Sequence, residues 1–235
     1  MLKTVLFDLD GSLLPMNQAV FTKEYTTRLA RRLASRGYSP DFVVKSLWHG
    51  VGAMVKNTGE LTNEEIFWAV FEKELGPAIR NESALFDDFY KNEFQEVIAV
   101  TSPSPQVPPL IAALKERGLR LVLATNPFFP KIATDSRIRW AGLSPSDFSH
   151  VTYYENSHFC KPNPLYYREI EEVCGISPDT SIMVGNDVEE DMMARELGYR
   201  VFLLTDCLLN PKERDIAAYP HGDFASLLAY IDTLL

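Results

Sequence analysis

The stretch that decides the fold is Val5-Leu6-Phe7-Asp8-Leu9-Asp10-Gly11-Ser12, a short apolar run that ends in two carboxylates one residue apart and a glycine. A carboxylate at the edge of an apolar core is costly unless it binds a cation or reacts. In an open α/β sheet the carboxyl ends of the strands face a ligand crevice. We therefore expect a strand whose end presents Asp8 and Asp10 to a ligand. Gly11 then lets the backbone leave the sheet sharply.

Two further segments offer groups that bind phosphate. The apolar run 119–124 is followed by Thr125 and Asn126, a hydroxyl and an amide at the end of a second expected strand. Lys161 precedes Pro162 in a loop whose proline rings restrict the backbone and hold the ammonium group in place. These segments predict a hydroxyl, an amide and a fixed positive charge near the two carboxylates.

A fourth segment supplies more acids. The run 181–185 reads as a strand and is followed by Asn186 and Asp187, and Asp191 comes four residues after Asp187. That spacing places the two acids on one face of a helix. Considered singly, each of the four segments has an ordinary explanation as a turn, a helix cap, a solvated lysine or first-turn acids. Their joint occurrence after successive apolar runs favours a phosphoryl-transfer site.

Together the four segments resemble the motifs of the haloacid dehalogenase-like (HAD) superfamily of phosphohydrolases, from Asp8 to about Gly198. The first motif of that family is DxD followed by glycine and threonine or serine, the second a strand-terminal Thr or Ser, the third a Lys, and the fourth an acid pair. The matching residues are Asp8–Ser12, Thr125, Lys161, and Asp187 with Asp191.

The fourth motif departs from the usual pattern. In many relatives an aspartate follows the glycine directly, whereas here Asn186 stands between Gly185 and Asp187. We assign the first acidic position to Asp187, because only it has an acid four residues later. Asn186 remains the alternative for this position.

The resemblance implies a Mg²⁺-dependent phosphatase that hydrolyses a small phosphorylated metabolite through an aspartyl-phosphate. Asp8 is then the nucleophile and Asp10 the general acid and base. Because Mg²⁺ prefers six oxygen ligands and keeps several waters, we expect it to bind between these strand ends. The implied phosphate-binding residues are Thr125, Asn126 and Lys161, the metal ligands are Asp8, the Asp10 carbonyl and Asp187, and the supporting residues are Asp191 and Gly11.

Other functions stay open at this point. A phosphomutase uses the same motifs, and a phosphonatase needs a lysine in the helical insertion, where Lys45 and Lys56 occur. A haloacid dehalogenase is less favoured because Asp10 and the metal acids would have no role. A non-catalytic, receiver-like signalling module also combines strand-end acids, Thr and Lys on an α/β sheet, but it is far shorter and lacks a helical insertion.

The order of expected elements predicts an α/β fold with an inserted helical domain. Helical patterns dominate from about residue 19 to 97. Thr62 with Glu65 fits a capping box at the start of one of these helices, and another helix is expected over about 84–95. Strands alternate with helices after a proline-rich linker at 101–105, and one of these strands is expected over 150–154. We predict a parallel core from residues 1–15 and 100–235 and a helical cap from 16–99. The family likeness implies a Rossmann-like core and a cap of the C1 type. In that cap, the stretch 48–52 is the candidate for substrate recognition.

Composition restricts the possible partners. The net charge of −9 and pI near 5.0 argue against binding to nucleic acid or anionic membranes. Three dispersed cysteines fit neither a disulfide framework nor a zinc site. The N-terminus does not resemble a signal peptide, so a cytoplasmic location is expected. The sequence does not indicate an oligomeric state.

Overall fold

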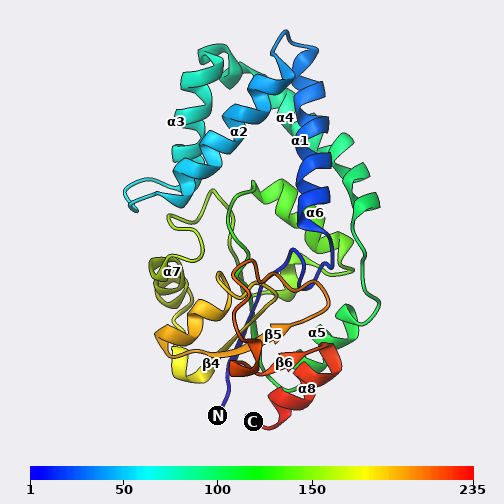
Figure 1. Ribbon diagram of the computed structural model, residues 1–235, viewed down its shortest axis with the longest axis vertical. Coiled ribbons are helices and arrows are strands. Elements are labelled where there is room, and N and C mark those ends of the chain that lie inside the picture. The colour runs from blue at the N-terminus through cyan, green and yellow to red at the C-terminus, as the bar shows by residue number, and fades with distance from the viewer.

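The computed structural model describes all 235 residues and contains one sheet of six parallel strands. The strand order is β3-β2-β1-β4-β5-β6, which puts the first strand in the middle. In Figure 1 the sheet lies at the end of the molecule that carries both termini, opposite the helices α1–α4. The strands are β1 Thr4–Phe7, β2 Arg120–Leu123, β3 His150–Val151, β4 Ser181–Gly185, β5 Arg200–Leu204 and β6 His221–Gly222.

The sheet is apolar on both faces because its strands alternate between two hydrophobic clusters. In β1, for example, Val5 and Phe7 belong to the larger cluster and Leu6 to the smaller one. The larger cluster includes side chains of the helices α5 (Val107–Glu116) and α8 (Phe224–Asp232), and the smaller one includes those of α7 (Pro164–Cys174). This layered arrangement explains why the strands read as continuous apolar runs.

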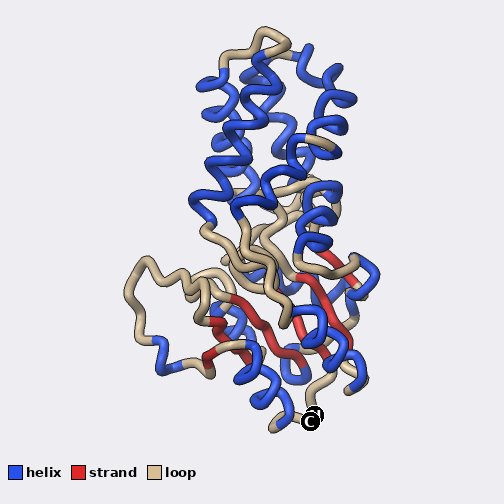
Figure 2. Tube along the Cα trace, turned by 90° about the vertical axis from the view of Figure 1, so that its right-hand side faces the viewer, coloured by secondary structure: helices blue, strands red, loops and turns tan.

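All regular elements between β1 and α5 are helices (Figure 2). Local signals set the helix starts: Asn17 caps α1, Pro40 occupies the first turn of α2, and Thr62 with Glu65 forms a capping box at α3. The helices are α1 Gln18–Ala34, α2 Pro40–Val55, α3 Asn63–Leu75 and α4 Ser83–Lys91, with 3₁₀ segments η1 Pro77–Glu82 and η2 Glu93–Val100.

Two chain crossings and a shared apolar layer join this helical segment to the sheet. The backbone N–H of Ser102 donates to the carbonyl of Pro15 at 2.8 Å, so the outgoing and returning chains lie side by side. The fully buried Phe94 of η2 stacks on Trp140 of α6 (Lys131–Trp140) with ring centroids 5.0 Å apart. Side chains of the helical segment and of the sheet therefore belong to one hydrophobic cluster.

The first two backbone N–H groups of α3 donate to the loop after β3. The N–H of Asn63 donates to the carbonyl of Ser157 at 2.8 Å, and that of Glu64 donates to the carbonyl of Tyr154 at 2.8 Å. Helix N-termini have N–H groups without intrahelical partners, and the loop after β3 satisfies two of them here.

The α/β class, the parallel sheet and the inserted helices agree with the sequence-based prediction, and four details differ from it. The strand expected over 150–154 is only His150–Val151, and the pair β6 and α8 was not expected. The helix expected over 84–95 ends at Lys91. After β4 the chain forms turns before the 3₁₀ segment η5 (Met192–Leu197), so Asp187 and Asp191 do not lie on a regular helix.

We predict that Phe94→Ala lowers the free energy of unfolding by about 3–5 kcal/mol, because it empties a fully buried site that joins the helices to α6. The control is Ile98→Ala in the same 3₁₀ segment, where the side chain is 37% exposed. We expect this change to cost about 1 kcal/mol or less. Urea denaturation measures the free energy of unfolding of both variants. An equal decrease in the two would contradict a special contribution of Phe94 to stability.

Candidate active site

The register of the sheet brings the ends of three strands together. Phe7 of β1 pairs with Leu123 of β2 and with Val184 of β4. The residues that follow these partners therefore leave the sheet at the same edge. Among them are Asp8, Thr125 and Asn186, all of which line one cavity.

The central contact of this edge is an ammonium group between two carboxylates. Lys161 Nζ lies 3.1 Å from Asp8 Oδ1 and 2.6 Å from Asp191 Oδ1, and its side chain is completely buried. Burial alone would lower the pKa of Lys161, but the carboxylates of Asp191 and Asp8 outweigh it and raise that pKa well above its ordinary value. The lysine is therefore a permanent positive charge beside Asp8.

Asn126 fixes the backbone at this lysine. Its Oδ1 accepts the N–H of Lys161 at 3.2 Å, and its Nδ2 donates to the carbonyl of the same residue at 3.4 Å. Nδ2 also donates to Glu190 Oε2 at 2.8 Å. Burial raises the pKa of Glu190 to about 8, against the opposing effect of Lys161, so this carboxyl adds little negative charge at neutral pH. Asn126 thus holds the loop in place in this structure.

Thr125 lies at the end of β2 in a rigid setting. Its carbonyl accepts hydrogen bonds from Thr152 Oγ1 at 2.6 Å and from the Tyr166 hydroxyl at 2.9 Å. The residue is only 2% exposed and contributes to the cavity wall. Its backbone position is therefore set by buried hydrogen bonds from two other segments.

Asp10 has a partner that the sequence analysis did not identify. The guanidinium of Arg137, on α6, is fully buried, pairs with Asp10 Oδ2 and lies over the Phe129 ring at 4.2 Å. Burial raises the pKa of Asp10 to about 6, although Arg137 opposes the rise. Asp10 Oδ1 is buried without a hydrogen-bond partner, while Asp10 itself lines the cavity. One oxygen of this carboxyl is therefore held and the other is free.

Asn186 and Asp187 play different structural parts. Ser12 Oγ donates to Asn186 Oδ1 at 3.0 Å, so Asn186 lies against the turn that follows Asp8. Gly11 in this turn has φ +86°, and a Cβ there would lie 2.4 Å from Asn186 Nδ2, which no side chain tolerates. Asp187 Oδ1 instead accepts the N–H groups of Glu189 at 2.7 Å and Glu190 at 2.9 Å.

Asp191 lies deeper than the other acids. Its Oδ2 accepts the N–H of Asp187 at 3.0 Å while its Oδ1 binds Lys161. A Cβ on Gly185 would lie 2.0 Å from this carboxylate, so the glycine before Asn186 makes room for it. Asp191 is thus a buried carboxylate partner of the lysine.

The oxygen donors at this edge fit a hard cation that keeps part of its water. No set of three or more His, Cys, Asp or Glu side chains forms a ready metal cage. Asp8 nevertheless has an oxygen not used by Lys161, and Asp10 has the orphaned Oδ1. Oxygen donors in small number, completed by water and phosphate, are what Mg²⁺ accepts.

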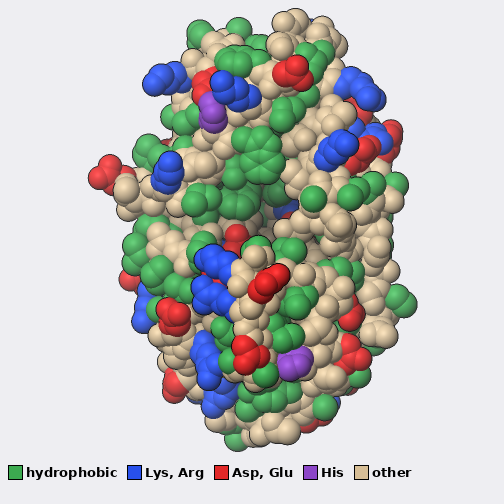
Figure 3. Space-filling model, in the orientation of Figure 1, with side chains coloured by type: hydrophobic (Ala, Val, Ile, Leu, Met, Phe, Trp, Pro, Cys, Tyr) green, Lys and Arg blue, Asp and Glu red, His purple; other side chains and the backbone are tan.

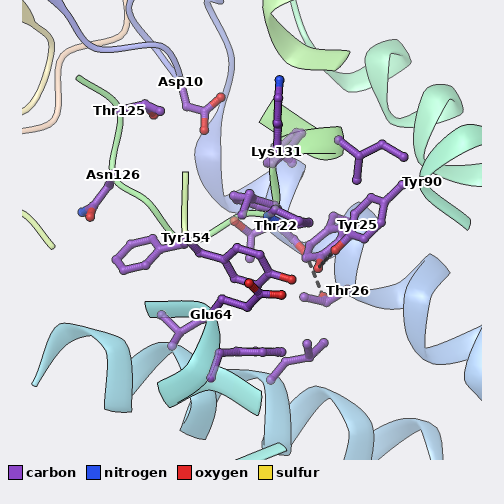
Figure 4. A pocket seen from close by; sticks show the side chains of 18 of the residues that line it. Asp10, Thr22, Tyr25, Thr26, Glu64, Tyr90, Thr125, Asn126, Lys131 and Tyr154 are labelled. Atoms are coloured by element: carbon purple, nitrogen blue, oxygen red, sulfur yellow. Dashed lines mark hydrogen bonds between the residues drawn. The ribbon is translucent and has the colours of Figure 1, made fainter. Parts of the chain in front are cut away.

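A cavity of about 750 Å³ opens from these residues toward the helical segment. In Figure 3 the surface is hollowed between the two halves of the molecule, and hydrophobic side chains gather around the hollow. Figure 4 shows Asp10, Thr125 and Asn126 on one side of the cavity and Tyr25, Tyr90 and Glu64 of the helical segment on the other. The strand ends and the helices therefore face each other across one space.

No helix in the structure combines the length and apolar character needed to span a bilayer.

Comparison with known proteins places this geometry in a family. The family model for haloacid dehalogenase-like hydrolases matches residues 2–205. A glyceraldehyde 3-phosphate phosphatase from Methanopyrus kandleri is 25% identical over 195 residues, which cover 82% of this chain and 78% of the relative. A phosphoglycolate phosphatase from Aquifex aeolicus is 26% identical over 201 residues, which cover 82% and 79%.

Solved structures agree on the fold. The crystal structure of a HAD phosphatase from Thermococcus onnurineus superimposes with a TM-score of 0.59 at 17% identity and covers 98% of both chains. The resemblance inferred from the four motifs is thereby confirmed. The chain belongs to the haloacid dehalogenase-like hydrolase family.

Proposed function

We propose that this protein is a Mg²⁺-dependent phosphatase that hydrolyses phosphate monoesters through an aspartyl-phosphate on Asp8. The observation that carries the proposal is the contact of the buried Lys161 ammonium with Asp8 and Asp191. It keeps a fixed positive charge beside a carboxylate at the end of a cavity, where a phosphate dianion needs both a nucleophile and neutralisation.

In the first step an oxygen of Asp8 attacks phosphorus, and the bond from phosphorus to the ester oxygen breaks. Asp10 gives its proton to the departing alkoxide through the unpartnered Oδ1. The pKa of about 6 produced by burial leaves a usable protonated fraction near neutral pH. The products are the free alcohol and phosphorylated Asp8.

In the second step Asp10, now a carboxylate, takes a proton from a water molecule as that water attacks phosphorus. The bond between phosphorus and Asp8 breaks and inorganic phosphate leaves. Arg137 holds the second oxygen of Asp10 through both steps, so the acid and base stays in one orientation. Splitting the reaction in this way replaces one difficult displacement by two easier ones.

The phosphoryl oxygens are bound by groups of fixed position. We propose that Thr125 donates to them and that Lys161 neutralises their charge, while Asn126 keeps the lysine loop in register. Asp8, the Asp10 carbonyl and Asp187 would hold Mg²⁺, which would supply positive charge that allows the nucleophile to approach the dianion. Asp191 and Gly11 support the site without touching substrate.

We further propose that residues 16–99 act as a cap over a core made of 1–15 and 100–235. The cavity between them supports this division. The hydrogen bond between Ser102 and Pro15, which joins the two segments that connect core and cap, supports it too. Closure of such a cap over bound substrate would position the ester for attack by Asp8, and reopening would admit the water of the second step.

A phosphonatase is not favoured by the cavity. Lys45 and Lys56, the two lysines of the helical segment considered for such a reaction, are exposed and do not line the cavity. In a dehalogenation the free oxygen of Asp10 would have no catalytic role. Phosphoryl transfer is therefore the activity that uses the groups present, and we propose water as the final acceptor.

We expect Asp8→Asn to reduce phosphate release by about three orders of magnitude or more, because the amide is a poor nucleophile. The substitution is nearly isosteric, so thermal unfolding should show a folded protein. Phosphate release is measured with sugar phosphates, nucleotides and small phosphorylated metabolites. Undiminished release by this variant would remove Asp8 as the nucleophile.

Removal of Mg²⁺ with EDTA should abolish phosphate release, and added Mg²⁺ should restore it. In Asp187→Ala we expect the Mg²⁺ concentration for half-maximal activity to rise about tenfold or more, because a direct ligand is lost. The matched variant is Asn186→Ala. A raised requirement in Asn186→Ala but not in Asp187→Ala would transfer the ligand role to Asn186.

A further inference from the structure

The wall that the helical segment contributes to the cavity has an unusual charge. Among its lining residues on α1 to α4 there is no lysine or arginine, and the two charged ones, Glu64 and Asp87, are acidic. Glu64 projects from α3 beside Tyr154 in Figure 4. A second anionic group on a substrate, such as a carboxylate, would find no positive charge on this wall. It would instead be repelled by the two acidic side chains.

The basic residues of the opposite wall are exposed to solvent, where water and dissolved ions screen their charge. These residues are Lys131 and Arg139, both on α6. Lys131 Nζ is already paired with Asp135 at 2.6 Å and lies 3.3 Å from the Tyr153 hydroxyl. The phosphate end thus has a buried cation, whereas the far end of the cavity has none.

The same wall is aromatic and offers few free hydrogen-bonding groups. Phe67, Trp68 and Phe86 pack edge to face around the cavity, and Trp48 of α2 lines it with about half of its surface exposed (52%). The polar atoms nearby largely satisfy one another. Thr26 Oγ1 donates to the Thr22 carbonyl at 2.8 Å, the hydroxyls of Tyr25 and Tyr90 lie 3.1 Å apart, and Trp68 Nε1 donates to the Tyr154 hydroxyl at 3.4 Å.

The volume of the cavity also favours a substrate with a large apolar part. A cavity of about 750 Å³ falls in the range of roughly 300–1,000 Å³ that accommodates drug-sized ligands. A two- or three-carbon phosphate ester would leave most of it to water against aromatic side chains. An apolar body would instead displace that water and stack on the rings.

We propose, on the basis of the phosphatase function above, that the preferred substrates are phosphate monoesters whose alcohol part is uncharged, largely apolar and carries an aromatic ring. Short anionic esters such as phosphoglycolate are poor substrates. The ring lies against Trp48 and Phe86, and Glu64 rejects a substrate carboxylate.

Three substrates with primary alkoxide leaving groups test this preference without changing the bond that breaks: 2-phenylethyl phosphate, ethyl phosphate and phosphoglycolate. We expect kcat/KM for the phenylethyl ester to exceed that for ethyl phosphate by about tenfold or more, chiefly through KM. Phosphoglycolate should be the slowest. Equal or faster turnover of phosphoglycolate overturns the proposal.

Binding separates this proposal from the phosphatase function on which it rests. Non-hydrolysable 3-phenylpropylphosphonate and propylphosphonate are titrated calorimetrically into the wild-type protein with Mg²⁺. About tenfold tighter binding of the phenyl compound supports the preference even if no ester is hydrolysed, in which case only the phosphatase function fails. Equal binding of the two compounds overturns the preference.

Two variants locate the selectivity. Trp48→Ala should raise KM about fivefold or more for the phenylethyl ester and leave ethyl phosphate unchanged. The matched control is Phe42→Ala on the same helix, where the ring is 41% exposed and does not line the cavity. Glu64→Gln should improve phosphoglycolate turnover several-fold without helping ethyl phosphate. Parallel changes for all substrates would contradict a recognition role for these residues.

Discussion

The buried contact of Lys161 with Asp8 and Asp191 is the constraint around which the site is arranged. A lysine without solvent exposure requires carboxylate partners, and these come from segments that follow β1 and β4. The lysine loop is in turn held by Asn126 at the end of β2. The ends of three strands thus meet at a single lysine, two of them through its ammonium group and one through its backbone. The ammonium contact also leaves only one oxygen of Asp8 available for chemistry.

Much of the fold could be predicted because local signals and long-range packing agree. The apolar run 119–124 and the capping box at Thr62 are explicit in the sequence, and both elements form where expected. The short strand β6 and the end of α4 at Lys91 could not be predicted, because they depend on neighbours rather than on pattern. A two-residue strand such as β6 exists only because β5 offers it an edge.

The site was predictable to the extent that each residue follows an apolar run, as Asp8 and Thr125 do. Arg137 was missed because it lies inside an ordinary helix, and nothing local distinguishes it from a solvated arginine. Only the fold reveals that its guanidinium is buried on Asp10. The different contacts of Asn186 and Asp187 could not be predicted either. They depend on the tertiary structure, because Asn186 packs against the turn at Gly11.

The aromatic layer at Phe94 and Trp140 affects how the molecule can move. Parting the helices from the sheet would wet these rings, and the free energy of such wetting depends on temperature and hardly on ionic strength. Cooling weakens contacts of this kind, whereas salt chiefly screens exposed charges. Breathing motions across the junction should therefore respond to cold and to chaotropes, and only slightly to electrolyte.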